Sequence, residues 1–171
     1  MILASLILES ASSWFLSSMI LVISTGMFFF YFQATCQKIL RRKFDQEYFQ
    51  SIVNANRLEF PAVRRALEDL DASVDFARLR MTLKCDYLAL TYLLKNAANL
   101  NQRYTREERL LILYFRVVLG ALLLRHSLGL KEKSAVLKLT QILQYFANVV
   151  GQRVNQFRFA NLSVSDYILN R

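Results

Sequence analysis

The sequence has few of the residues that interrupt regular structure. It contains one proline and four glycines in 171 residues, whereas turn-rich β-folds need turn residues at intervals of about 8–12 positions. More than half of the chain, 54%, is hydrophobic, and its many Leu, Ala, Arg and Gln residues favour helices. We therefore expect an all-α fold.

Histidine and cysteine are scarce as well. One His and two Cys are too few for a metal cluster, and two cysteines do not make a disulfide framework. The four glycines are isolated, so they form neither a dinucleotide-binding nor a P-loop pattern. The serines have no His–Asp partners at recognisable places. We expect no metal, no cofactor and no catalytic residue, and hence a protein that is not an enzyme.

Positive charge is missing from residues 1–37, where the one charged side chain is Glu9. Residues 13–33 are predominantly apolar, and about 20 such residues cross roughly 30 Å of hydrocarbon. A cleaved signal peptide needs a basic segment ahead of its apolar stretch, and none is present here. The sequence therefore predicts a single transmembrane helix near the N-terminus.

Four positive charges follow this helix at once. We name them the basic collar: Lys38, Arg41, Arg42 and Lys43. The positive-inside rule then places Met1 outside and residues 38–171 inside. We expect a single-pass protein of the bacterial inner membrane, with its C-terminal domain in the cytoplasm, or of the mitochondrial inner membrane, with that domain in the matrix. Anionic lipid headgroups are the expected partners of the collar.

The transmembrane helix is diluted with small residues. Ser18 and Gly26 are candidate contacts for a second membrane helix, because small side chains let helix backbones approach closely. The alternative is that the hydroxyl groups bond back to carbonyls of their own helix.

No glycine or proline occurs between Met27 and Phe60, and apolar residues recur there every four positions. This predicts that the membrane helix continues as a stalk to about Asn56. The alternative is a break near Lys43, with a separate amphipathic helix lying on the membrane. The predicted regions are 1–37 (outer segment and transmembrane helix), 38–60 (collar and stalk), 61–154 (cytoplasmic helical bundle) and 155–171 (tail).

Apolar spacing and helix-end signals predict a bundle of three to four helices. Thr105 and Glu108 have the spacing of a capping box, which starts a helix, and Gly129 supplies the left-handed residue that ends one. Pro61 suits a first helical turn. The predicted helices are 61–70, 74–99, 106–128 and 131–150, followed by a tail that we expect to be partly extended.

Residues 110–124 form a second apolar tract, LLILYFRVVLGALLL. It is shorter than a full span, and Arg116 at its centre costs about 2.5–3.5 kcal/mol to insert. We therefore expect the core helix of the bundle. A buried Arg116 needs a partner, for which Asp86 is the candidate, unless its stem lets the charge reach water. Apolar surface that the bundle leaves uncovered indicates a protein interface.

His126 is the one histidine, and it lies near the end of a predicted helix. A phosphate-accepting histidine on a helical hairpin is one hypothesis. The tract LLLRHSLGLKEK shows no acidic neighbour of the kind that such a histidine uses, and no nucleotide-binding domain follows. A helix C-terminus also favours a positive imidazole through the helix dipole alone.

Residues 95–171 hold twelve basic and four acidic side chains. They are scattered over several predicted helix faces, so we do not expect nucleic acid as a partner. The tail alternates basic and aromatic residues, which suits docking to an anionic membrane surface or an acidic groove. The candidate docking residues are Arg153, Phe157, Arg158, Phe159 and Tyr167.

These patterns favour a non-catalytic accessory, scaffold or assembly subunit of a larger inner-membrane complex, with other membrane-protein subunits as partners. The alternative is a membrane-tethered signalling or regulatory module with phosphotransfer at His126.

Overall fold

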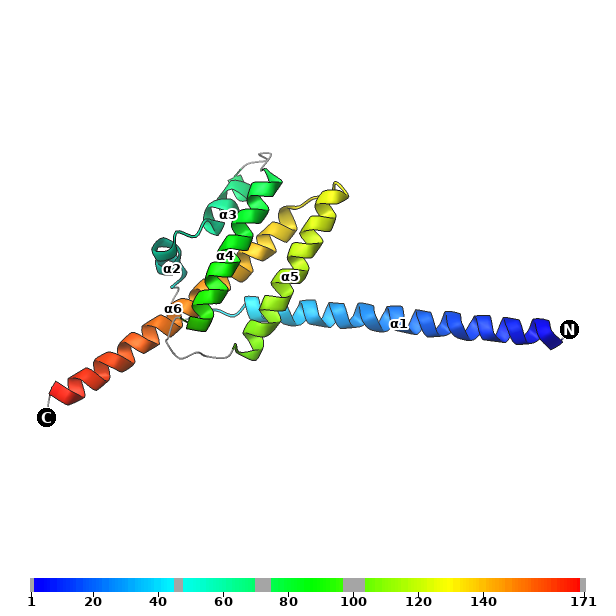
Figure 1. The fold of residues 1–171 in the computed structure, drawn as a ribbon, viewed down its shortest axis with the longest axis horizontal. Helices are drawn as coiled ribbons and strands as arrows, with labels where there is room; N and C mark the ends of the chain where they lie inside the picture. The colour runs from blue at the N-terminus through cyan, green and yellow to red at the C-terminus, as the bar shows by residue number, and fades with distance from the viewer. Residues whose placement is uncertain (1, 45–47, 70–74, 97–103, 170–171) are drawn as a thin grey trace. The chain divides into compact units, whose positions relative to one another are not determined.

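The computed structural model confirms the all-α class. It describes residues 2–44, 48–69, 75–96 and 104–169, and the side chains of residues 14–44, 48–68, 75–96 and 104–156. Every regular element within those ranges is an α-helix. The helices are α1 (Ile2–Leu40), α2 (Phe49–Asn56), α3 (Phe60–Asp69), α4 (Phe76–Asn96), α5 (Arg106–Ser127) and α6 (Lys133–Leu169) (Figure 1). The chain divides into two compact units, Met1–Arg41 and Arg42–Arg171.

The first unit is the helix α1. Its segment Trp14–Leu40 is long and apolar enough to cross a membrane. The Ser18 hydroxyl donates to the backbone carbonyls of Trp14 and Phe15, each at 3.0 Å, so this polar group is satisfied within its own helix, as hydrocarbon surroundings demand. The Ser18 hydroxyl therefore bonds back to its own helix, which was the alternative to contact with a second membrane helix. A role of Ser18 and Gly26 in helix packing stays a prediction.

The predicted stalk is wrong, because α1 ends at Leu40 and α2 is a separate helix. The alternative of a break near Lys43 describes this helix end correctly. The helix α2 packs against α6, where the Phe49 backbone N–H donates to the Asn148 side-chain oxygen at 2.8 Å. Val53 is buried in the same contact region. A continuous stalk would leave that apolar face in water, whereas packing on α6 buries it.

The centre of the second unit is α6, which contacts α2, α3, α4 and α5. We expected the helix 106–128 to hold that position. Instead α5 covers one side of α6, and α4 covers another (Figure 1). The buried apolar residues of α6 are Ala135, Val136, Leu139, Ile142, Leu143, Phe146, Ala147 and Val150.

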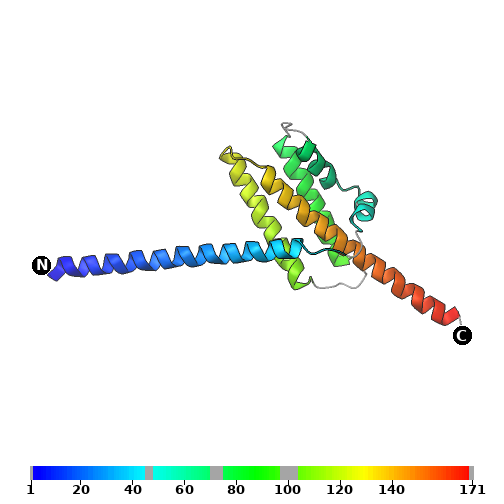
Figure 2. The ribbon, with the colours of Figure 1, turned by 180° about the vertical axis from the view of Figure 1, so that it is seen from behind.

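The prediction that the last helix, 131–150, ends before Gly151 is wrong, and so is the expectation of a partly extended tail. The helix continues to Leu169, and its last turns extend past the rest of the bundle (Figure 2). A Cβ atom added at Gly151 would collide with the Cβ of Tyr48. The glycine therefore allows the chain before α2 to approach α6 closely, which is a different use from ending a helix.

The local helix-end signals are confirmed. Thr105 and Glu108 form both bonds of the capping box that starts α5. Gly129 has a φ of 66° just after α5 ends, in the left-handed region that glycine adopts without strain. Pro61 lies in the first turn of α3.

Candidate functional site

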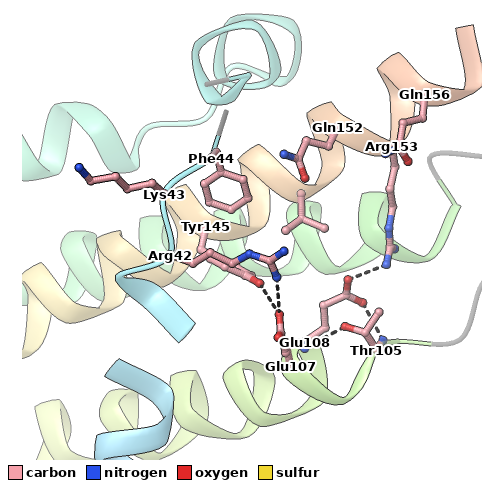
Figure 3. Close-up of a pocket in the computed structure, with 11 residues that line it drawn as sticks. Arg42, Lys43, Phe44, Thr105, Glu107, Glu108, Tyr145, Gln152, Arg153 and Gln156 are labelled. Carbon is pink, nitrogen blue, oxygen red and sulfur yellow. Dashed lines mark hydrogen bonds and ion pairs between the residues drawn. The ribbon is translucent and has the colours of Figure 1, made fainter. Parts of the chain in front are cut away.

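A polar cleft of about 270 Å³ lies among the start of α5, the middle of α6 and the segment that precedes α2. Figure 3 shows Arg42 and Arg153 on opposite sides of the adjacent glutamates Glu107 and Glu108. The cleft is lined by Arg42, Lys43, Phe44, Thr105, Glu107, Glu108, Tyr145, Val149, Gln152, Arg153 and Gln156.

The capping box holds the side chain of Glu108 in place in the lining of the cleft. Its backbone N–H donates to the Thr105 hydroxyl at 3.2 Å, and its Oε2 accepts from the Thr105 N–H at 3.0 Å. The other oxygen, Oε1, accepts from the Arg153 guanidinium at 2.5 Å. The side chains of Glu108 and Arg153 are 3% and 14% exposed, so this ion pair is nearly removed from water.

Arg153 connects three helices. Besides Glu108 of α5, its guanidinium donates to the Leu94 carbonyl near the end of α4, at 2.5 Å. Carbonyls in the last turn of a helix have no partner within it, and this one is satisfied by a charge from α6. Arg153 is therefore a structural residue of the bundle, and a role for it in docking the tail to a partner stays a prediction.

Glu107 is held by two donors. Its Oε2 accepts from the Tyr145 hydroxyl at 3.1 Å and from the Arg42 guanidinium at 3.4 Å. Burial raises the pKa of Tyr145, and the nearby carboxylate acts in the same direction, so the phenol stays protonated and donates at neutral pH. Both glutamates of the cleft are thus paired within the bundle.

The predicted buried ion pair between Arg116 and Asp86 is wrong. Arg116 is exposed on α5. Asp86 is buried on α4, and its Oδ2 accepts from the backbone N–H groups of Glu59 and Phe60, at 3.0 and 2.7 Å. Asp86 therefore caps α3 from another helix. Burial raises its pKa, which the two backbone hydrogen bonds oppose.

His126 has an acidic neighbour that we did not expect. Its Nδ1 lies 2.6 Å from Glu132 Oε1, across the turn that Gly129 makes between α5 and α6. Its ring stacks on Phe76 of α4, with centroids 3.7 Å apart. The histidine side chain is still 52% exposed.

The outer side of α5 carries exposed apolar residues. Leu113, Val117 and Leu124, which we name the α5 stripe, are 52%, 41% and 65% exposed. Their spacing places them on one face of the helix, opposite the buried residues that contact α6. By length and composition α5 could also cross a membrane, but a stripe of its side chains is buried within the bundle.

A second exposed apolar row lies on α4. It consists of Met81, Leu88 and Tyr92, and we name it the α4 stripe. The opposite face of α4 supplies Leu79, Leu83, Tyr87, Leu90 and Leu94 to the core. Tyr87 stacks on Phe115 of α5, with ring centroids 4.1 Å apart.

The remaining candidate residues are spread over several places. Of the basic collar, Arg42 and Lys43 line the cleft, while Lys38 and Arg41 do not. The side chains of the other tail candidates, Phe157, Arg158, Phe159 and Tyr167, lie outside the described residues.

The functional features that the sequence reasoning missed are contacts between distant segments. The cleft joins residues more than 60 positions apart, and no local pattern indicated it. The contact between His126 and Glu132 could have been predicted from the sequence, because the turn predicted at Gly129 brings the two residues together.

No group of three or more His, Cys, Asp or Glu residues is placed to hold a metal ion in the described part of the chain. The chain matches no protein-family model, no curated protein and no solved structure. The fold defines it as an all-α helical bundle with candidate membrane-spanning helices.

Proposed function

We propose that this chain is a non-catalytic accessory, scaffold or assembly subunit of a larger inner-membrane complex. The anchor is α1, and residues 42–171 form the part that meets other subunits. The observation that carries the proposal is the α5 stripe, because exposed apolar rows on a helix are typical of protein contact surfaces.

The orientation follows from charge. The basic collar follows the apolar segment directly, and the positive-inside rule keeps such residues on the cytoplasmic or matrix side. The bundle is then on that side of a bacterial or mitochondrial inner membrane, and its partners are other membrane-protein subunits.

The chemistry of the partner follows from the residues around the α5 stripe. Arg106, Arg109 and Arg116 lie at helical spacings that place them on the same exposed face. Arginine is enriched at protein interfaces, and the buried centre of an interface is more apolar than the rest of the protein surface. A matching partner presents an apolar face that bears carboxylates, which would pair with these arginines.

This proposal predicts the behaviour of a fragment that lacks residues 1–37. Residues 38–171 will self-associate in solution, because both stripes are left without their partner. Changing Leu88 and Leu113 together to Glu will make the fragment largely monodisperse, as light scattering after size exclusion will measure.

The matched control adds the same two charges at exposed positions outside the stripes, Ala62→Glu with Gln141→Glu. We expect this fragment to self-associate as the unchanged fragment does. A fragment 38–171 that is monodisperse without any substitution would remove the main support for an obligate subunit.

A second function, a membrane-tethered phosphotransfer module, is favoured by the geometry of His126. A carboxylate on Nδ1 orients the ring and favours a proton there, which makes Nε2 the nitrogen that can accept a phosphoryl group from a phosphodonor protein. This function predicts acid-labile phosphate on the isolated chain that is lost in His126→Gln. Phosphate that persists in the variant would exclude His126 as the acceptor.

A further inference from the structure

The α4 stripe is part of a longer row of exposed residues on α4. Cys85 is exposed and lies between Met81 and Leu88, where a cysteine acts as a small apolar residue. The apolar positions 81, 85, 88 and 92 therefore follow one another at alternating intervals of four and three residues. A cation continues the same spacing at each end. We name the whole row the α4 seam: Arg78, Met81, Cys85, Leu88, Tyr92 and Lys95.

The spacing of the α4 seam is that of a coiled-coil contact, in which apolar residues recur every 3.5 positions on average. Met81, Leu88 and Tyr92 are 63%, 55% and 68% exposed, so the bundle covers little of the seam. At about 1.5 Å per residue, the seam is about 25 Å long, which is the length of roughly two heptads. It has the pattern and the length to pack against one further helix.

The bundle already occupies the opposite face of α4. That face supplies the buried residues Leu79, Leu83, Leu90 and Leu94, and α4 contacts α6 and α3 (Figure 1). The α4 seam is the part of this helix that is left for another chain.

The charges along α4 indicate the chemistry of that chain. Besides the cations at its two ends, the seam has Lys84 exposed next to Cys85. The one acidic residue of α4, Asp86, is buried and bonded to the start of α3. Glu59, which precedes α3, contacts Thr82 at 3.4 Å, on the flank of α4 and outside the seam. The seam is therefore apolar along its middle and cationic at both ends.

A second copy of this chain does not match that charge pattern. In a parallel pair of seams, Arg78 would face Arg78 and Lys95 would face Lys95, and in an antiparallel pair Arg78 would face Lys95. Both orientations place like charges opposite each other, which opposes pairing. A helix that carries carboxylates is complementary to the seam in either orientation.

We propose that the α4 seam binds an amphipathic helix of a partner subunit, which presents apolar residues at heptad spacing and carboxylates at both ends of the contact. This inference rests on the proposed function, because it takes residues 42–171 as the part of the chain that meets other subunits. It adds the kind of segment that one of those subunits supplies.

The test uses the full chain in neutral detergent and two synthetic helical peptides of three heptads. Both have leucine at the contact positions, and they carry either Glu or Lys at the flanking positions. Each has a central cysteine activated as a pyridyl disulfide. The Cys85 thiolate displaces pyridinethione, whose absorbance gives the rate, and mass spectrometry maps the bond to Cys85. We expect the Glu peptide to react about tenfold faster than the Lys peptide.

A charge-reversal variant makes the test specific to the seam. In Arg78→Glu with Lys95→Glu, we expect the Lys peptide to react faster than the Glu peptide. A misfolded chain would lose the preference and would not reverse it. The matched control makes the same change of charge at exposed positions outside α4, Lys131→Glu with Lys133→Glu. At physiological salt we expect the preference for the Glu peptide to change less than about threefold in this control.

Three outcomes would overturn the proposal. A Glu peptide of the same composition without heptad spacing that reacts equally fast would indicate general attraction between charges. A dimer of the chain linked through Cys85, formed faster than the bond to the Glu peptide, would assign the seam to a second copy. Cys85 that N-ethylmaleimide modifies in phosphatidylcholine bilayers and not in phosphatidylglycerol bilayers would assign the seam to an anionic membrane surface.

The same experiment separates this inference from the proposed function. If the Glu peptide fails to react preferentially while membrane-protein partners still co-purify with the full chain, the subunit function stands and the helical partner of the α4 seam is rejected. If no partner co-purifies, the proposed function fails whatever the peptides do.

Discussion

Replacing Arg153 with methionine will lower the free energy of unfolding of the bundle by about 3–5 kcal/mol, the usual cost of leaving one member of a buried ion pair without its partner. Glu108, with a side chain only 3% exposed, would keep its charge without the guanidinium. The Leu94 carbonyl would lose its donor as well. Urea unfolding of the full chain in detergent micelles, followed by circular dichroism, will measure the loss.

Two controls isolate the charge from the packing. The double variant Arg153→Met with Glu108→Gln removes the uncompensated charge, and glutamine keeps the capping box, so it will be more stable than Arg153→Met alone. Glu68→Gln breaks the exposed pair with Arg64, whose side chains are 39% and 49% exposed, and will cost only about 0.3–0.5 kcal/mol. A loss in Arg153→Met no larger than in Glu68→Gln would refute the structural role of Arg153.

Replacing Asp86 with alanine will lower the free energy of unfolding by about 2–3 kcal/mol. The backbone N–H groups of Glu59 and Phe60 both donate to the same oxygen of Asp86. Alanine leaves both donors unsatisfied in a region where Phe60 is 2% exposed. Hydrogen exchange at the start of α3 will become faster in this variant than in the parent chain.

Asparagine at position 86 is the matched variant, because its single carbonyl oxygen can accept both bonds. We expect it to lower the free energy of unfolding by less than about 1.5 kcal/mol.

The same variant also tests the direction in which the fold shifts the pKa of Asp86. Burial raises the pKa of Asp86, so the folded chain binds a proton more readily than the unfolded chain. This contribution makes the parent chain gain stability as the pH falls towards the ordinary pKa of an aspartate. Asp86→Asn lacks the contribution, and an identical pH dependence in both proteins would contradict it.

The parts of the fold that were predictable are those encoded within one turn of helix. Thr105 and Glu108 are three residues apart and satisfy each other's backbone, so their types alone indicate where α5 starts. Gly129 and Pro61 act through their own backbone dihedral angles. The boundaries of α3, α4 and α5 followed closely from such signals and from apolar spacing.

The parts that were not predictable depend on contacts between distant segments. A glycine after an apolar helical segment usually indicates the end of the helix. At Gly151, however, the missing side chain makes room for Tyr48, and the helix continues. The break after Leu40 depends on the burial of α2 against α6. Asp86 and Arg116 have opposite charges on neighbouring predicted helices, and nothing in their spacing indicates that Asp86 faces α3 and Arg116 faces outward.

We infer above all that the chain is a subunit of a membrane complex, with its apolar stripes in contact with other subunits. Gentle detergent extraction of the tagged full chain, followed by identification of co-purifying chains, tests it most directly. We predict a fixed set of membrane-protein partners in near-stoichiometric amounts, released when Leu88 and Leu113 are changed to Glu and retained when Ala62 and Gln141 are changed to Glu. A full chain that is extracted alone, in a monodisperse form with no partner in constant proportion, would contradict the claim.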